Sequence, residues 1–386
     1  MRETFLPFSP PAIGEEEIRE VIDTLRSGWI TTGPKTKRFE TEFATYLQAP
    51  GALALSSGTA ALHTALVASG IGPGDEVITT TMTFCATVHV IEQVGATPVL
   101  VDVQPDTLNI DPELVAAAVT PRTRAILPVH YGGHPCEMAR LQEIATRHDL
   151  VIIEDAAHAL PARYKGRLIG SGDNPVAFSF YATKNLTTGE GGMLTGSPDF
   201  LERARILSLH GMDRDAWKRY DKGGNWYYDV VAAGFKYNMT DIQASLGIWQ
   251  LHKLDRFHER RRTIASVYRT SLSKYPHFQI PCELPGVECA WHLYPILLRT
   301  ESGIRDRDQF FAGMQARNIG TSVHFIPIHM HRYYQKKYRY RNEDYPVATD
   351  SYKRLLTLPL YPRLTDNDVQ DVLAAIIEIA ENCSGA

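Results

Sequence analysis

Short apolar runs alternate with stretches of helical character from residue 53 to about residue 195, and this alternation restricts the fold more than any other feature of the chain. The helical stretches lie at residues 59–67, 86–94, 112–119 and 137–147. Buried strands that alternate with helices predict an α/β layer with a mostly parallel sheet. Such sheets bind ligands at the carboxyl ends of their strands, so we expect the chemistry in the loops that follow the runs. The runs are ALALS, DEVITT, TPVLVDV, RAILPVH, LVIIEDA, VAFSFY and GGMLTG.

The second half of the chain has a different pattern. Beyond about residue 250 a long charged helix is followed by aromatic segments interrupted by proline, then by a final helix in DVQDVLAAIIEIA. The chain has 386 residues, more than twice the ~150 residues of an average domain. We predict a large α/β domain over residues 1–250, which includes an N-terminal arm and helix, and a smaller α+β domain over residues 251–386. The N-terminal helix is predicted from one apolar face, formed by Ile18, Val21, Ile22 and Leu25.

Composition excludes several classes of protein. Lys and Arg total 40 against 44 Asp and Glu, a formal net charge of −4, which excludes a basic protein that coats nucleic acid. The five cysteines are scattered without a C-x-x-C pair, which argues against zinc or redox chemistry and indicates a reducing compartment. The first residues lack the apolar run of a signal peptide, and no stretch reaches the ~18 apolar residues of a membrane span. We expect a cytoplasmic protein that binds neither membrane nor nucleic acid.

The segment VIIEDAAHA, residues 151–159, ends a predicted strand with two acidic residues. Asp155 lies at the carboxyl end of this strand, and His158 follows one helical turn later. A carboxylate there suits a ligand site, but it equally suits a cap for a following helix. His158, taken alone, is also compatible with a buried core histidine.

The segment VAFSFYATKNLTTGEGG, residues 176–192, places a lysine between two predicted strands. Ser179 lies at or near the end of the first strand, and Lys184 follows in the loop. Desolvation in such a loop lowers a lysine pKa and makes the amine a nucleophile toward carbonyls. An ordinary surface lysine is the alternative.

The segment LSSGTAALHTAL, residues 55–66, leads from a strand into a helix through Ser56, Ser57, Gly58 and Thr59. Exposed N–H groups and the positive end of the helix dipole make such a start a cradle for phosphate. The same residues also suit a simple N-cap.

These three segments together meet the needs of a pyridoxal phosphate enzyme. The helix start would anchor the phosphate, Asp155 would keep the pyridine nitrogen protonated, and Lys184 would form the Schiff base. Phe84, which follows the run DEVITT, is placed to stack on the cofactor ring.

Further motifs extend along nearly the whole chain, and with them the sequence resembles the nucleotide-sugar aminotransferases of the DegT/StrS group. These are pyridoxal phosphate enzymes of the aspartate-aminotransferase fold, fold type I. Within the group the chain is similar to the C4 aminotransferases that make UDP-4-amino-4-deoxy-L-arabinose and to those that act on UDP-linked 4-keto-6-deoxyhexoses. The motifs are SGWITTGP, SSGTAAL, GDEVITT, ATPVLVDV, AILPVHYGG, IIEDAAHA, SFYATKN, GEGG, GFKYNMTDIQA and AWHLYPI.

The resemblance implies a role for each matching cofactor residue. Lys184 and Asp155 would be the catalytic pair, and His158 would neighbour the cofactor ring at its 3-hydroxyl. Asn238 matches an asparagine that reaches the phosphate from the other subunit, which implies a homodimer with shared active sites. The phosphate and the ring face would be held by Gly58, Thr59, Ser179 and Phe84.

The resemblance also implies substrate contacts in several loops. The loop with Thr31 and Thr32 lines the active site in relatives, although packing on the partner subunit explains it equally well. His329 and His331 would share one face of a strand, but no third metal ligand is evident nearby, so we expect no metal. The expected substrate contacts are Thr31, Thr32, Tyr181, His329 and Tyr333.

The reaction that the resemblance implies is transamination of a UDP- or TDP-linked 4-keto sugar by L-glutamate, which gives a 4-amino sugar nucleotide and 2-oxoglutarate. Histidine at position 158 is typical of C4 enzymes, whereas C3 enzymes tend to carry glutamine. Tyr181, Phe84 and Gly58 replace the histidine, tryptophan and alanine of the arabinose-type enzyme, which leaves the sugar open. The alternatives are a C3 aminotransferase, a dehydratase, in whose relatives histidine replaces Lys184, and a cofactor-binding regulator.

Overall fold

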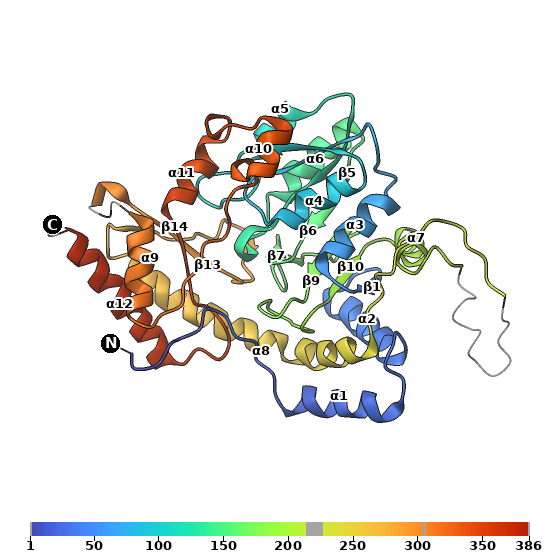
Figure 1. Ribbon diagram of the computed structural model, residues 1–386, viewed down its shortest axis with the longest axis horizontal. Helices are drawn as coiled ribbons and strands as arrows, with labels where there is room; N and C mark the ends of the chain where they lie inside the picture. The colour runs from blue at the N-terminus through green and yellow to red at the C-terminus, as the bar shows by residue number, and fades with distance from the viewer. Residues whose placement is uncertain (1, 214–226, 303, 305, 385–386) are drawn as a thin grey trace.

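The computed structural model describes residues 2–213, 227–302, 304 and 306–384, and a twisted mixed sheet lies at its centre (Figure 1). One half of the sheet is parallel, in the order β3-β2-β4-β5, and the other half has the order β1-β10-β9-β6. Only Ile153 separates β5 from β6, and Val129 pairs in parallel with Asp155, so the two halves join. The strands are β1 Ala52–Leu55, β2 Glu76–Thr80, β3 Thr97–Val101, β4 Thr123–Leu127, β5 Val151–Ile152, β6 Glu154–Asp155, β9 Val176–Ser179 and β10 Gly192–Thr195.

Helices connect these strands where the alternation predicts them. Ser57 caps α3 by accepting the N–H of Ala60 at 3.0 Å, and Asp111 caps α5 in the same way. The strands are almost entirely buried, as expected for a sheet covered by helices. The predicted α/β fold is therefore confirmed, with β10 antiparallel to both of its neighbours. The helices are α3 Gly58–Ala68, α4 Cys85–Gln93, α5 Pro112–Ala118, α6 Met138–His148 and α7 Pro198–Ser208.

A smaller sheet, β11-β13-β14, and four helices form the C-terminal part. Helix α12 packs beside α9 and against α8 (Figure 1). A third sheet pairs β12 with the hairpin β7-β8. The elements are β7 Arg163–Tyr164, β8 Arg167–Leu168, β11 Phe278–Gln279, β12 Val287–Glu288, β13 Tyr294–Leu298, β14 Leu355–Leu358, α9 Arg307–Ala316, α10 Arg332–Tyr338, α11 Pro346–Arg354 and α12 Asp366–Ser384. Short 3-10 turns lie at Tyr131–Gly133, Thr300–Ser302, Ile328–Met330 and Asn342–Asp344.

A 32-residue helix, α8 (Asp241–Leu272), crosses the position at which we divide the chain. A capping box between Thr240 and Gln243 starts it. The N-terminal arm lies on the C-terminal part, because Leu6 pairs with Ile319 and belongs to the same apolar cluster. The division at residue 250 stays a prediction.

Asp241, the first residue of α8, ties the loop after residue 27 to helix α2 (Pro34–Leu47). Its carboxylate accepts the N–H groups of Gly33, Lys35 and Thr36 at 2.8 to 3.0 Å, and the Thr36 hydroxyl at 2.6 Å. Asp241 is fully buried. It thus replaces the acceptors that the first N–H groups of α2 lack.

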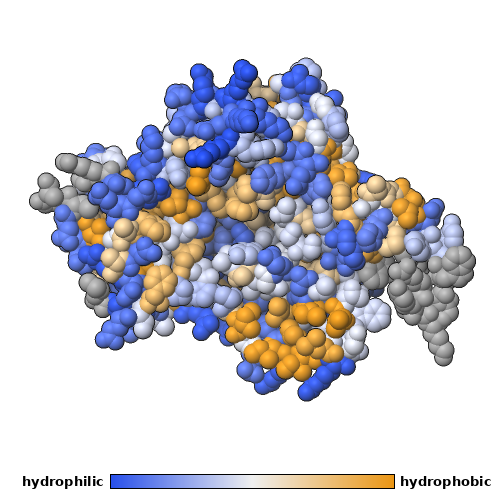
Figure 2. Space-filling view, viewed as in Figure 1, coloured by the Kyte–Doolittle hydropathy of each residue, from blue (hydrophilic) through white to orange (hydrophobic). Residues whose placement is uncertain are grey.

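Helix α1 (Glu15–Ser27) confirms the predicted helix, but its apolar face points to solvent in the single chain. Glu17 and Thr24 are buried instead, and Glu17 accepts hydrogen bonds from Gln250 and Lys253 of α8. Figure 2 shows the resulting hydrophobic patch over α1, at the bottom of the view. We call this patch the α1 stripe; its exposed members are Ile18 (44 %), Ile22 (40 %) and Leu25 (54 %).

Two further observations concern the whole described chain. None of its described helices is long and apolar enough to cross a membrane. The four cysteines with described side chains are free, namely Cys85, Cys136, Cys282 and Cys289.

Candidate active site

The three predicted segments meet at one edge of the sheet. β6 and β9 run parallel, with Asp155 opposite Ala177, so Asp155 and Ser179 end neighbouring strands on the same side. Gly58, at the start of α3, lies directly against Ser179: a Cβ built on Gly58 would be 2.9 Å from the Ser179 Cβ. Parallel strands end at a common edge, which is why residues so distant in the chain converge.

The start of α3 forms a cradle of backbone N–H groups. The first N–H groups of a helix have no partner within the helix, and the Ser57 hydroxyl accepts only that of Ala60. Gly192 of β10 lies beneath the cradle, where an added Cβ would be 2.4 Å from the Ser57 carbonyl oxygen and 2.7 Å from the Gly58 nitrogen. Because Gly192 has no side chain, β10 can pack this closely beneath the cradle. The N–H groups of Gly58 and Thr59, at the start of the helix, are available for an anion.

Asp155 is buried, with 5 % of its surface exposed. Its Oδ1 accepts the N–H of Ala157 at 3.1 Å, and its Oδ2 accepts the hydroxyl of Thr87 at 2.9 Å. Burial raises the pKa of Asp155, while these two hydrogen bonds and the charge of Lys184 act to lower it. The alternative role as a helix cap is wrong, because no helix follows Asp155: residues 156–162 are turns and irregular backbone.

Lys184 lies in the loop between β9 and β10 and is half-buried. Burial lowers the pKa of Lys184 from 10.5 to about 8, and the negative charge of Asp155 partly opposes this change. An amine of lowered pKa, part of which is unprotonated near neutral pH, is suited to attack on a carbonyl. The geometry therefore favours a nucleophile over a solvated surface lysine.

His158 is buried beside the lysine, and its ring orientation is fixed. Its Nδ1 accepts the N–H of Gly132 at 3.3 Å, so the neutral ring carries its proton on Nε2. Burial and the charge of Lys184 hold the pKa of His158 well below 6.5. Its ring stacks on Phe325 with centroids 5.7 Å apart. His158 is thus a neutral donor through Nε2.

His292 also lies next to Lys184, and our sequence analysis missed it. Asn185 donates both amide hydrogens, to the carbonyls of Leu160 and Ala290, so its Oδ1 must accept from Nδ1 of His292 at 3.1 Å. Burial holds the pKa of His292 well below 6.5. The motif AWHLYPI contains this residue, but it lies more than 100 positions from Asn185, and nothing in the sequence indicates that the two meet.

The segment that contains His324 and Phe325 also reaches this site. Burial and Lys184 lower the pKa of His324 to about 4, and the Phe325 ring lies 5.9 Å from that of Phe84. Phe84 itself is 59 % exposed at the start of α4. Aromatic rings from two distant segments therefore border the space beside His158.

Asn238 lies close to the cradle of its own chain, since its backbone pairs with that of Leu55. Its amide donates to the hydroxyl of Thr32, which in turn donates to the Met239 carbonyl oxygen. Thr31 shares this loop, and its carbonyl accepts the Asp241 N–H at 3.0 Å. The loop and Asn238 thus form one hydrogen-bonded unit.

Two of the expected substrate contacts already have hydrogen-bond partners within the chain. His329 has no exposed surface, and its two ring nitrogens are bonded to the hydroxyls of Thr81 and Thr349 at 2.7 and 2.9 Å. A side chain so enclosed cannot reach a substrate, so the structure argues against our expectation for His329. Tyr333 is exposed and donates to Glu92 at 2.6 Å. Tyr181 lies in the same loop as Lys184 and is half-exposed.

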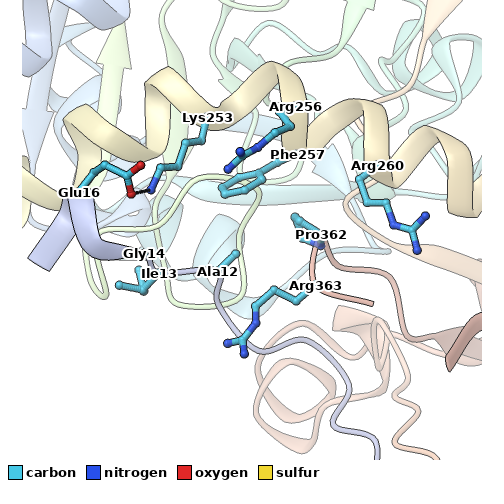
Figure 3. Close-up of a pocket in the computed structure, with 10 residues that line it drawn as sticks. All are labelled: Ala12, Ile13, Gly14, Glu16, Lys253, Arg256, Phe257, Arg260, Pro362 and Arg363. Carbon is cyan, nitrogen blue, oxygen red and sulfur yellow. Dashed lines mark hydrogen bonds and ion pairs between the residues drawn. The ribbon is translucent and has the colours of Figure 1, made fainter. Parts of the chain in front are cut away.

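A groove of about 520 Å³ lies elsewhere, between the N-terminal arm and α8 (Figure 3). Its lining includes Lys253, Arg256, Arg260 and Arg363 but none of the predicted cofactor residues. Among the residues that the structure describes, no group of three His, Cys, Asp or Glu side chains could hold a metal ion.

The residues at the sheet edge fit pyridoxal phosphate. An N–H cradle next to the Ser179 hydroxyl suits a phosphate, a buried carboxylate suits a protonated pyridine nitrogen, and a lysine of lowered pKa suits an aldehyde.

Comparison with known proteins points the same way. Residues 11–377 match the model of the DegT/DnrJ/EryC1/StrS aminotransferase family. The spore coat polysaccharide biosynthesis protein SpsC of Bacillus subtilis is 50% identical over 382 residues, 98% of each chain. Spr1654 from Streptococcus pneumoniae, a proposed sugar aminotransferase solved in its PLP form, is similar with a TM-score of 0.91 and 36% identity, over 98% of this chain and 99% of that one. Helicobacter pylori PseC, an aminotransferase involved in the biosynthesis of pseudoaminic acid, is similar with a TM-score of 0.91 and 28% identity, over 98% of this chain and 100% of that one.

Proposed function

Because the chain belongs to the DegT/DnrJ/EryC1/StrS aminotransferase family, and is thus a pyridoxal-phosphate-dependent sugar aminotransferase, we propose that it moves an amino group from L-glutamate to the 4-keto group of a UDP- or TDP-linked sugar. The products are a 4-amino sugar nucleotide and 2-oxoglutarate. The observation that carries the proposal is the low-pKa amine of Lys184 beside the buried Asp155, at the sheet edge that also holds the cradle.

We assign the catalytic roles to Lys184 and Asp155. Pyridoxal phosphate supplies an aldehyde that condenses with amines and a pyridine ring that accepts electrons from the reacting carbon. Nζ of Lys184 would bind the aldehyde and, once displaced by the donor, would move the proton from the α-carbon of glutamate to the aldehyde carbon of the cofactor. Asp155 holds the proton on the pyridine nitrogen, which keeps the ring electron-poor. In the second half of the reaction Lys184 would move a proton in the reverse direction, from that cofactor carbon to the sugar carbon.

The other assigned residues bind and orient the cofactor. The N–H groups of Gly58 and Thr59 and the hydroxyl of Ser179 hold the phosphate. Phe84 covers one face of the ring, and Nε2–H of His158 is available to donate to the 3-hydroxyl oxygen. The fixed Nε2–H tautomer of His158 supports this role, because the 3-hydroxyl oxygen needs a donor.

The choice of C4 rests on His158, and the sugar contacts are assigned to Thr31, Thr32, Tyr181 and Tyr333. A C3-specific aminotransferase is the second candidate, because Phe84, Tyr181 and Gly58 depart from the arabinose-type pattern. A dehydratase is disfavoured by the presence of Lys184. The relative SpsC is named for polysaccharide biosynthesis, which supports a product that serves polysaccharide assembly here as well.

We also propose a homodimer with shared active sites; the resemblance gives Asn238 to the site of the other subunit, although in the single chain Asn238 lies beside its own cradle. The α1 stripe supports the dimer: three apolar side chains on one helix face gain from being covered, at about 25 cal/mol per Å² of buried apolar surface. We further assign the α/β domain to residues 1–250 and the smaller domain to residues 251–386. The free cysteines support a reducing, cytoplasmic compartment.

The decisive experiment uses the pyridoxamine phosphate form of the protein and a panel of 3-keto and 4-keto nucleotide sugars. Return of the absorption band of the lysine-bound cofactor reports amino transfer to the sugar. We expect the band to return with one or more 4-keto sugars linked to UDP or TDP. Return with a 3-keto sugar alone would refute the C4 assignment and leave the C3 aminotransferase.

Substitution of the lysine tests the catalytic assignment. Lys184→Ala should lose both the band of the lysine-bound cofactor and all steady-state turnover, because no other site residue that the structure describes supplies the amine. Steady-state turnover by this variant would refute the role of Lys184.

A further inference from the structure

Two threonines at the start of α4 continue the hydrogen bonds of Asp155 into the protein. Thr87 Oγ1 lies 2.9 Å from Asp155 Oδ2, and Thr83 Oγ1 lies 2.7 Å from Thr87 Oγ1. Both threonines are 1 % exposed. Buried hydroxyls at these distances form a connected chain that water does not reach.

The protons in this chain can point in only one direction. A hydroxyl has a single proton, and an ionised carboxylate only accepts. Thr87 therefore gives its proton to Asp155, so the bond between the two threonines must be donated by Thr83. Each hydroxyl orients the next, and the chain ends on one oxygen of the carboxylate.

We propose that Thr87 is a positioning residue for Asp155 and that Thr83 orients Thr87. This inference rests on the proposed function, in which Asp155 holds the proton on the pyridine nitrogen. The hydroxyl fixes Oδ2 while the N–H of Ala157 fixes Oδ1, so the carboxylate plane is set by two donors from different segments. One lone pair on each oxygen remains for the cofactor.

The same hydroxyl also favours the ionised form of the carboxyl group. Burial is the largest influence on Asp155 and raises its pKa, whereas Ala157 and Thr87 are the next largest and lower it. The positive charge of Lys184 and the His130 ring act in the same direction as Thr87. His130 is itself occupied, because it donates through Nε2 to Glu154 at 3.0 Å. Thr87 thus contributes one of the only two direct hydrogen bonds that stabilise the Asp155 carboxylate among the described residues.

The first turn of α4 joins Thr87 to Phe84, the residue expected to stack on the cofactor ring. Phe84 caps the helix, and the Thr87 N–H donates to its carbonyl oxygen at 3.2 Å. The turn that carries the expected ring-stacking residue therefore also carries the group that sets the carboxylate. A substitution that keeps the shape of Thr87 removes the hydroxyl without disturbing this turn, since only the backbone makes the bond to Phe84.

The test compares Thr87→Val and Thr87→Ala, which both lack the hydroxyl, with Thr87→Ser, which keeps it. The holoenzymes are prepared with pyridoxal phosphate labelled with ¹⁵N in the ring, and the ¹⁵N chemical shift reports whether the pyridine nitrogen is protonated. We expect the two hydroxyl-free variants to lose part of the protonated signal and to show kcat reduced on the order of 10- to 100-fold. KM for the nucleotide sugar should stay unchanged. Thr87→Ser should restore both the ¹⁵N shift and kcat.

Two further variants distinguish a failure of the role assigned to Asp155 from a failure of the role assigned to Thr87. Thr83→Val leaves the Thr87 hydroxyl in place, so it should change the ¹⁵N shift in the same direction but less. Asp155→Asn should abolish the protonated signal. If Asp155→Asn keeps that signal, the assigned role of Asp155 is overturned. If Asp155→Asn loses it while Thr87→Val and Thr87→Ala keep the wild-type shift and kcat, the role of Thr87 alone is overturned.

Discussion

The titration of Lys184 is the most direct test of the electrostatics of this site. Two influences act on it in opposite directions: burial lowers the pKa, and the negative charge of Asp155 raises it. The substitution Asp155→Asn removes the charge but keeps the shape of the side chain. We therefore expect this substitution to lower the pKa of Lys184 below its wild-type value of about 8.

The size of the wild-type effect follows from the fraction of free amine. With a pKa of about 8, roughly a quarter of the Lys184 amine is unprotonated at pH 7.5, against about 0.1 % for a lysine with the ordinary pKa of ~10.4. Only the free amine attacks an acyl or carbonyl carbon. In the cofactor-free protein at pH 7.5, the fraction of Lys184 present as free amine should thus be about 200-fold larger than that of a solvated lysine of equal nucleophilicity.

Competitive labelling with acetic anhydride measures this availability without the cofactor. The apoprotein is labelled between pH 6 and pH 11 beside a free lysine derivative, and mass spectrometry follows the peptide that contains Lys184. Half-maximal labelling is expected near pH 8 in the wild type and at lower pH in Asp155→Asn. A wild-type midpoint near that of the free derivative would refute the burial argument, and an upward move in Asp155→Asn would refute the proximity of the two charges.

Three further perturbations test the cradle, the framework and the dimer. Gly192→Ala forces a Cβ to 2.4 Å from a cradle carbonyl oxygen, so titration with pyridoxal phosphate should show at least ~10-fold weaker binding. The control Gly172→Ala, whose added Cβ would meet nothing within 4 Å, should bind normally. Equal affinity of the two variants would contradict the assignment of the cradle. Asp241→Asn disturbs the bonds at the start of α2 and should lower the free energy of unfolding in urea by about 2 kcal/mol; a loss indistinguishable from zero would show that the carboxylate is dispensable. Ile22→Lys in the α1 stripe should shift the sedimenting species from dimer to monomer. The control Leu114→Lys, at similar exposure (41 %) on α5, should leave the dimer intact. A stable dimer of Ile22→Lys would exclude the stripe as the subunit contact.

The residues to which we assign the chemistry could be chosen from the sequence because each follows a recognisable strand. Asp155 and Lys184 stand in the segments VIIEDAAHA and VAFSFYATKNL, where a run of apolar residues ends in polar ones. Parallel strands place their carboxyl ends together whatever the remaining sequence is. Convergence of these segments with the cradle at Gly58 was therefore predictable, and the close approach of Gly58 to Ser179 agrees with it.

Other features depended on contacts that a linear pattern does not contain. The periodicity of α1 predicted a helix with an apolar face, but Glu17 and Thr24 lie on the buried side, where Gln250 and Lys253 of α8 donate to the Glu17 carboxylate. His329 was expected at the substrate, yet its neighbours Thr81 and Thr349 enclose it in the core.

The sequence by itself thus determined the α/β class and the strands, and it pointed to the lysine and carboxylate that we assign to the site, because local periodicity and the direction of parallel strands carry that information. Only the tertiary structure decided the protonation states around the lysine. The Nε2–H tautomer of His158, the acceptor that faces His292 and the direction of the Thr83–Thr87 chain each depend on which buried polar group meets which. Burial without water forces every such group to find a partner, and that choice exists only once the chain is folded.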